Sequence, residues 1–226
     1  MNFFPAQYST LSPAALKDHI ENIYGLQLAS CRLLSRNVSD TYLLEGSSAK
    51  YILRVYRAAY RPLVQIKGEV ELLDILKDAG VPVSYPIADQ SGNKIQNLNA
   101  IEGVRYAILF SYAVGKPALI PDEQQLKIIG RKIALMHNVC ANCILRNERP
   151  VYDMLTTLEK PLEIIRHRFD GLPDEYDRLC KITAKTIAKL HQLDTSAFSN
   201  GYCHYDLLPK NFHFDENNNI TFFDFD

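Results

Sequence analysis

The sequence predicts an α+β protein: an antiparallel sheet that carries one helix, followed by a mostly helical part. Short β-rich runs separated by turn signals occupy residues 26–110. One helical pattern, at about 64–78, interrupts these runs, and helical patterns predominate from Pro121 onward. We therefore expect two lobes, an N-terminal domain over residues 1–110 and a helical domain over residues 111–226.

The composition is that of an ordinary globular protein, with 47% hydrophobic and 23% charged residues. A formal net charge of −1 offers no general attraction to nucleic acid or to an anionic membrane. No apolar run approaches the length of a membrane-spanning helix, and the first residues do not resemble a signal peptide. Five cysteines, an odd number, favour a reducing compartment. We expect a cytoplasmic protein without nucleic-acid or membrane partners, and the sequence makes no prediction of oligomeric state.

The first helix is expected over residues 12–24, because Ser12 and Pro13 form a helix start and Gly25 forms a stop. The helix at 64–78 is expected to end before Gly80 and Pro82. Strands are expected at residues 42–44, 51–56, 81–83 and 104–110. Later helices are expected at about 122–139, at 151–168 with a break at Pro161, and at 173–193.

The stretch from His137 to Cys143 contains a Cys-x-x-Cys pair, Cys140 and Cys143, which resembles a metal clip or a redox pair. The sequence has no second Cys-x-x-Cys, and the stretch lies near a helix end without a thioredoxin-like context. Structural cysteines are therefore the favoured interpretation.

The clearest chemical signal lies near the end of the sequence. His204 and Asp206 are followed by Asn211, and an apolar strand then leads to Asp224. Phosphoryl transfer from a nucleotide needs such a set, with one carboxylate to position an acceptor hydroxyl and an amide oxygen and second carboxylate to hold Mg²⁺. The alternative is that these are turn residues around Pro209 and solvated residues at a strand end. The combined pattern favours a kinase-type phosphotransferase.

The N-terminal half offers a candidate loop for the phosphates at Ser35-Arg-Asn-Val-Ser-Asp40, between two strands. The loop contains no glycine, but Asn37 and Ser39 tolerate turns and can donate hydrogen bonds. An ordinary hairpin loop is an equally good interpretation.

Arg54 lies within the apolar strand Tyr-Ile-Leu-Arg-Val-Tyr, where an unpaired charge is expensive. Helical spacing places Glu69 on the same face as Leu72 and Leu76, so this carboxylate is expected to point toward the sheet. We expect Arg54 and Glu69 to pair, whereas Glu71 is expected to be solvated. The alternative is a solvent-facing arginine on an edge strand.

The stretch Phe110-Ser-Tyr-Ala-Val-Gly115 links the last strand of the sheet to the helical part. A purine base could hydrogen-bond to exposed backbone here and stack on apolar side chains. Phe110 and Tyr112 are therefore candidate cofactor-binding residues.

These features together resemble the aminoglycoside phosphotransferase and choline kinase-like superfamily, over essentially the whole chain. The similar segments include the helix from Glu69 to Val83, the helix from Ile129 to His137, and the catalytic loop. Arg149-Pro-Val-Tyr-Asp153 is similar to the branch of stress-response and type-II homoserine kinases. The resemblance implies a two-lobed protein-kinase-like fold.

The resemblance also implies roles for individual residues. Asp206 is expected to be the catalytic base, Asn211 and Asp224 the Mg²⁺ ligands, and His204 a structural brace. Arg54, with Glu69 as partner, is expected to contact the ATP phosphates. The implied reaction moves the γ-phosphoryl group of ATP to a hydroxyl of a small molecule, such as an amino sugar or amino alcohol. Two alternatives are a nucleotide-binding or regulatory module without turnover and a protein Ser/Thr kinase.

The sequence departs from the family pattern at three positions of the loop, where Tyr205, Leu208 and Lys210 replace the usual glycine, histidine and glycine. These departures bear on acceptor recognition. Family members also continue well past the metal-binding aspartate, so we expect the helical lobe to be incomplete, in a fragment of a longer protein or a truncated product.

Overall fold

The computed structural model describes residues 9–58 and 60–225 and divides the chain into two compact units. Unit 1 comprises residues 1–148 together with 201–226, and unit 2 comprises residues 149–200. Each unit is described by itself. Among the described residues, none of the helices combines the length and apolar character that crossing a membrane requires.

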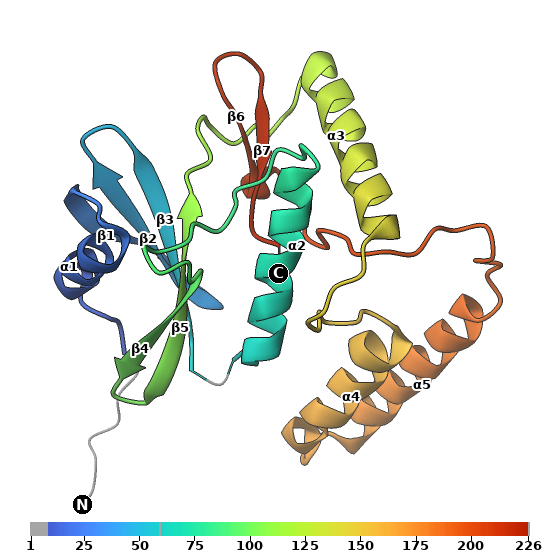
Figure 1. Cartoon of the computed structure of the whole chain (residues 1–226). Coiled ribbons are helices and arrows are strands. Elements are labelled where there is room, and N and C mark those ends of the chain that lie inside the picture. The colour runs from blue at the N-terminus through green and yellow to red at the C-terminus, as the bar shows by residue number, and fades with distance from the viewer. Residues whose placement is uncertain (1–8, 59, 226) are drawn as a thin grey trace, which may run out of the picture. The chain divides into compact units, whose positions relative to one another are not determined.

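Unit 1 is built on a five-stranded antiparallel sheet, which confirms the α+β class expected from the sequence (Figure 1). The strand order is β1-β2-β3-β5-β4. The strands are β1 (Leu28–Arg36), β2 (Ser39–Gly46), β3 (Lys50–Tyr56), β4 (Ile95–Ala100) and β5 (Gly103–Ser111). The central position of β3 excludes the alternative that Arg54 lies on an edge strand.

The two faces of the sheet contribute to different apolar clusters, because side chains alternate along each strand. Leu53 and Val55 of β3 pack with the helix α1 (Pro13–Tyr24), which begins with Ser12 capping the Ala15 amide. Ile52 and Tyr56 of β3, whose side chains point to the other face of the sheet, belong to the second cluster. That second cluster also contains residues of α2 (Leu63–Asp78), α3 (Glu123–Asn142), β6 (Phe212–Phe214) and β7 (Ile220–Phe222).

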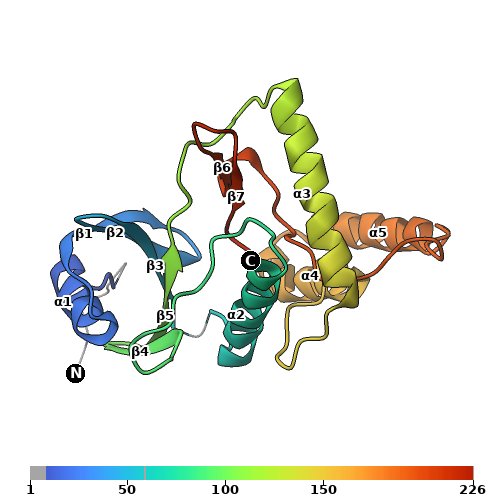
Figure 2. The same cartoon turned by 45° about the horizontal axis from the view of Figure 1, so that its top comes forward.

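The β6–β7 hairpin comes from the end of the sequence but belongs to unit 1 (Figures 1 and 2). The prediction of a strand at 81–83 was wrong: only Val83 makes an isolated bridge, to Phe222 of β7. Pro82 has no amide hydrogen to contribute to a ladder, but its carbonyl accepts from the Phe222 amide at 2.8 Å. This segment therefore connects the hairpin to α2.

The helix α3 begins with a capping box at Asp122 and Gln125 and carries Cys140 near its end. Cys140 is buried in the apolar cluster, and burial raises the pKa of its thiol to about 12. Glu71, which was expected to be solvated, is half-buried, and its carboxylate also accepts hydrogen bonds from the backbone amides of Arg146 and Asn147. Glu71 thus ties α2 to the loop that follows α3.

Unit 2 is helical, as expected. It contains a π-helical turn (Leu155–Glu159), α4 (Lys160–Ile165), a 3₁₀ turn (Arg166–Phe169) and α5 (Pro173–Leu190). The break predicted at Pro161 is a change from π-helix to α-helix beside this proline, not an interruption. Tyr176 of α5 stacks on Phe169 at 5.6 Å between ring centroids and donates to the Leu162 carbonyl.

Candidate active site

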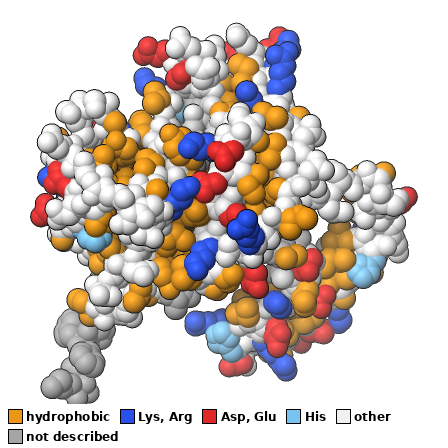
Figure 3. All heavy atoms as spheres, in the orientation of Figure 1, with side chains coloured by type: hydrophobic (Ala, Val, Ile, Leu, Met, Phe, Trp, Pro, Cys, Tyr) orange, Lys and Arg blue, Asp and Glu red, His pale blue; other side chains and the backbone are white. Residues whose placement is uncertain are grey.

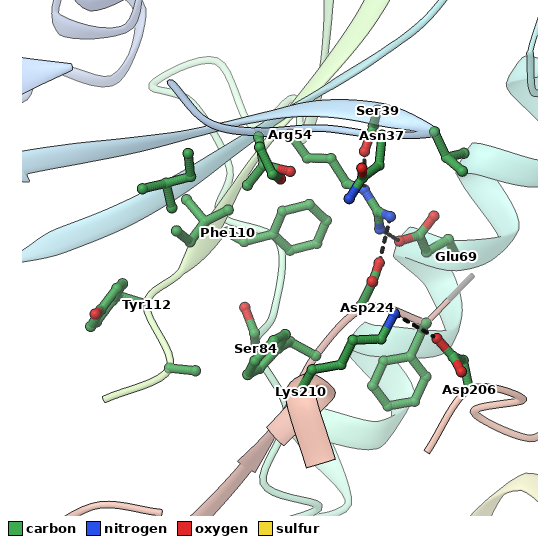
Figure 4. A pocket seen from close by; sticks show the side chains of 18 of the residues that line it. Asn37, Ser39, Arg54, Glu69, Ser84, Phe110, Tyr112, Asp206, Lys210 and Asp224 are labelled. Atoms are coloured by element: carbon green, nitrogen blue, oxygen red, sulfur yellow. Dashed lines mark hydrogen bonds and ion pairs between the residues drawn. The ribbon is translucent and has the colours of Figure 1, made fainter. Parts of the chain in front are cut away.

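A cavity of about 580 Å³ in unit 1 brings together most of the residues singled out in the sequence. Its walls come from the β1–β2 hairpin, β3, α2, the linker after β5 and the β6–β7 region (Figure 4). In the face shown in Figure 3, basic side chains lie beside acidic ones in the middle of the surface. Eight predicted site residues line the cavity: Asn37, Ser39, Arg54, Glu69, Phe110, Tyr112, Asp206 and Asp224.

Arg54 is the central cation of this cavity. Its Nε donates to Ser39 Oγ at 2.8 Å, and its Nη1 lies 3.3 Å from Glu69 Oε1. Its Nη2 donates to Asp224 Oδ1 at 2.5 Å (Figure 4). Only 9% of Arg54 is exposed, so these partners offset the cost of removing the guanidinium from water. The predicted Arg54–Glu69 pair is confirmed.

Glu69 is almost fully buried and has further partners beyond Arg54. Tyr56 donates its hydroxyl hydrogen to Glu69 Oε2 at 2.9 Å, and Arg61 Nη1 lies 3.6 Å from the same oxygen. Both carboxylate oxygens are therefore engaged. Glu69 therefore fixes the position of the Arg54 guanidinium in the wall of the cavity.

The loop between β1 and β2 is a tight turn. The Asn37 amide donates to the Ser39 carbonyl at 3.1 Å, and the Ser39 side chain is buried against Arg54. Directly after it, the buried Asp40 carboxylate accepts from Arg105 Nη1 at 2.9 Å. Arg57 Nη2 lies 3.6 Å from the same carboxylate. Sequence reasoning missed this buried charge network, which anchors the base of the loop.

Asp206 and Asn211, the residues of the predicted catalytic loop, lie together. Asn211 is buried, and its Nδ2 donates to both the backbone carbonyl and the carboxylate Oδ2 of Asp206, at 2.8 and 2.9 Å. The Asp206 side chain is 40% exposed, and Lys210 Nζ lies 3.5 Å from its Oδ2. Asn211 therefore orients the Asp206 carboxylate, which is still exposed enough to reach a molecule in the cavity.

Two residues of the predicted site adopt left-handed backbone angles, a conformation that costs energy for a residue with a side chain. Tyr205 and Asp224 both have φ of 68°. Tyr205 occupies the position where the family usually has glycine, so the sequence signal and the strain coincide. Such strain is typical of functional sites.

His204 connects the catalytic loop to the segment that carries Asp224. It is fully buried, its Nε2 donates to the Phe223 carbonyl at 2.9 Å, and its ring packs on Phe225. Burial lowers the pKa of His204, which outweighs the nearby carboxylates. A neutral imidazole therefore joins the two segments, as the expected brace would.

The donor set is suitable for a hard divalent cation. Because Asn211 Nδ2 faces Asp206, the amide oxygen of Asn211 is on the opposite side of the group. Asp224 uses Oδ1 for Arg54 and has a second carboxylate oxygen. One amide oxygen and one carboxylate, completed by phosphate oxygens, is a set that Mg²⁺ accepts.

The end of β5, where the linker begins, is held by Ser84 and Tyr85. Ser111 exchanges hydrogen bonds with Tyr85, and Ser84 Oγ donates to the Ser111 carbonyl at 2.6 Å. Phe110 and Tyr112, which precede and follow Ser111 in the sequence, both line the cavity (Figure 4). Sequence reasoning missed Ser84, which the Val-Pro-Val segment before it brings to the linker.

The model of the phosphotransferase enzyme family (APH) matches residues 30–226. The uncharacterized protein sll1119 of Synechocystis is 32% identical over 99% of this chain and 62% of its own length. Amicoumacin kinase of Bacillus subtilis is 24% identical over 90% of this chain and 60% of its own length. The chain thus spans less than two thirds of these relatives.

Solved structures share the fold. The amicoumacin kinase hAmiN, in complex with AMP-PNP, Ca²⁺ and Ami, has a TM-score of 0.73 at 20% identity, covering 94% of this chain and 63% of the other. The family match covers most of the chain, and the neighbours have the protein-kinase-like fold expected from the sequence. The chain belongs to the phosphotransferase enzyme family.

Proposed function

We propose that this protein is an ATP-dependent phosphotransferase that moves the γ-phosphoryl group to a hydroxyl of a small molecule, of the amino sugar or amino alcohol type. One observation carries the proposal. A buried cation, Arg54, and two carboxylates, Asp206 and Asp224, line one cavity together. This is the charge arrangement that transfer of a phosphoryl group between two oxygens requires.

The geometry supports the following roles. Asp206, oriented by Asn211, accepts the proton of the acceptor hydroxyl as the hydroxyl oxygen attacks the γ-phosphorus. The bond from that phosphorus to the bridging oxygen breaks, and ADP leaves. Arg54 binds phosphate oxygens, and Glu69 keeps its guanidinium in place. Asn211 and Asp224 would hold Mg²⁺, which supplies neutralisation of charge on the phosphates. Positioning and electrostatics supply most of the rate.

The relatives support the class of acceptor. Two of the matched kinases are named for amicoumacin. A further solved structure is that of a microcompartment-associated aminopropanol kinase. Its TM-score is 0.66 at 21% identity, and the match covers 94% of this chain and 69% of the other. Both names denote small molecules. Tyr205 and Lys210 lie beside Asp206 and are exposed, which supports them as candidates for contact with such an acceptor.

The first test is calorimetric binding of ATP with and without Mg²⁺ to the 226-residue chain. Asp224→Ala is expected to remove the Mg²⁺-dependent part of the affinity. Asp78→Ala, which removes an exposed carboxylate at the end of α2, is the matched control and should bind as the parent does. Lack of Mg²⁺-dependent binding in the folded parent would contradict the proposal.

Turnover is tested separately, with small amino alcohols and amino sugars as acceptors. Asp206→Asn is expected to lower kcat by about 10²- to 10⁴-fold while ATP still binds, because the base is lost and the shape is kept. Binding without turnover on any acceptor would instead favour a nucleotide-binding module.

A further inference from the structure

Lys210 brings an ammonium group to the cavity at a position where the family usually has glycine. It belongs to the 3₁₀ turn Pro209–Asn211, in which the Asn211 amide donates to the Leu208 carbonyl at 2.8 Å. The side chain of Lys210 is 64% exposed and points toward Asp206 (Figure 4). The backbone of Lys210 is thus held by the turn, whereas its long, exposed side chain can exchange one anionic partner for another.

The buried charges of the cavity leave little positive charge for a triphosphate. The guanidinium of Arg54 already pairs with two carboxylates, those of Glu69 and Asp224. Asp206 adds a further negative charge. Among the described residues that line the cavity, Arg54 is the only arginine and Lys210 the only lysine. Because the transferred phosphoryl group spreads negative charge over its oxygens, Lys210 is the side chain that can supply the missing positive charge beside a metal ion.

The ammonium group is also close enough to the reacting atoms. Lys210 Nζ lies 3.5 Å from Asp206 Oδ2. A hydroxyl that donates to this carboxylate has its oxygen about 2.7 Å away, and an attacking oxygen lies about 3–3.5 Å from the atom it attacks. The γ-phosphorus then lies within about 6 Å of the Asp206 carboxylate, so rotation of the lysine side chain can bring Nζ to the γ-phosphate oxygens.

We propose that Lys210 is a further substrate-binding residue, whose ammonium group moves from Asp206 to the γ-phosphate of bound ATP. The inference rests on the proposed function. In this arrangement Arg54, fixed by its buried partners, is the stationary cation of the site, and Lys210 is the movable one. Because ADP lacks the γ-phosphate, the contact distinguishes ATP from ADP and is lost when the product leaves.

Two other uses of Lys210 would give different results. A lysine that contacts only the acceptor would change the affinity for the acceptor and leave nucleotide binding unaltered. A lysine that only pairs with Asp206 would affect ATP and ADP alike, or neither. The ratio of the two nucleotide affinities therefore isolates the contact with the γ-phosphate, because every other contact is common to ATP and ADP.

The test compares the affinities of the whole chain for ATP and ADP by calorimetry, with Mg²⁺ and without an acceptor. AMP-PNP, which resists hydrolysis, is measured beside ATP. The parent is expected to bind ATP more tightly than ADP. In Lys210→Met the ATP:ADP affinity ratio should fall about three- to tenfold, because one exposed charge-assisted contact is lost and ADP binding is unchanged. Lys210→Arg keeps the charge and should retain most of the ratio, and Lys116→Met, at an exposed lysine outside the cavity lining, should not change it.

An unaltered ATP:ADP ratio in folded Lys210→Met would overturn the inference while leaving the proposed function intact. An equal loss of affinity for both nucleotides would also overturn it, because the contact would then lie outside the γ-phosphate. Equal binding of ATP and ADP by the parent would have the same meaning. Failure of the folded parent to bind either nucleotide in the presence of Mg²⁺ would overturn both proposals.

Discussion

Unit 1 and unit 2 differ in how their helices are supported. Unit 1 contains two clusters of fully buried apolar side chains, one on each face of its sheet. Unit 2 spans 149–200, all of it described, and contains no fully buried residue. The cavity and its charged residues also lie in unit 1.

The helix α5 shows the difference most clearly. Its half-buried residues recur at helical spacing and form one stripe: Tyr176, Leu179, Cys180, Thr183, Thr186 and Ile187. Its other contacts are local, such as the exposed pair of Lys181 and Asp177. Helices held mainly by local contacts are marginal, so the two units should differ in stability as well as in chemistry.

Hydrogen exchange should show the largest difference. Amides of β3 and β5 are expected to exchange only by global unfolding, which for a domain costs about 5–15 kcal/mol. Amides of α5 are expected to exchange through local opening at much lower cost. The measurement is exchange of the whole chain followed by mass spectrometry of peptides. Equal protection of β3 and α5 would remove the distinction.

The same substitution in each unit gives the next largest effect. Leu53→Ala, at a position with 0% exposure in β3, is expected to destabilise the protein by about 2–5 kcal/mol. Leu179→Ala on the half-buried stripe of α5 should cost about 1 kcal/mol or less. Urea unfolding followed by circular dichroism measures both, and a larger cost for Leu179→Ala would reverse the comparison.

Thiol labelling compares cysteines within and between the units. Burial raises the pKa of Cys140 to about 12, so its reactive thiolate is rare at pH 8. We expect Cys140 to react with iodoacetamide about tenfold or more slowly than the exposed Cys203 or the half-buried Cys180. Mass spectrometry of the labelled peptides gives the order, and early labelling of Cys140 would show that the α3 end is open.

The smallest effect concerns pH and His204. Burial lowers its pKa in the folded protein, so below roughly pH 6.5 the unfolded chain binds a proton that the folded chain does not. The stabilisation is therefore complete above the unfolded pKa and is lost as the pH falls toward the folded one. Urea midpoints between pH 8 and 5 should show this loss, and His204→Gln should reduce it; an identical pH dependence in the variant would assign the loss to other groups.

Local patterns were enough to predict much of unit 1. Helical spacing placed Glu69 toward the sheet, and the cost of an unpaired charge in an apolar strand made Arg54 its expected partner, as the structure confirms. The linear order of Asp206, Asn211 and Asp224 indicated one site before any fold was known. The roles of these residues in catalysis and metal binding stay predictions.

Contacts between distant segments could not be predicted. The ion pair of Arg54 and Asp224 joins residues 170 positions apart, and no local pattern encodes such a distance. The Asp40 network depends on β5 lying where Arg105 can reach it. The run at 81–83 has strand composition, but Pro82 leaves it as a connection with one bridge. Composition alone cannot distinguish such a connection from a strand.

The return of residues 201–225 to unit 1 has a consequence for synthesis. The ribosome delivers the sheet and α2 first, but Phe212, Phe214, Ile220 and Phe222, which complete one apolar cluster, emerge only after the 52 residues of unit 2. Until then the nascent chain exposes the apolar side of α2 and α3 to water, the state in which chaperones bind and chains aggregate. Translation pauses within the codons for unit 2 would lengthen that exposure.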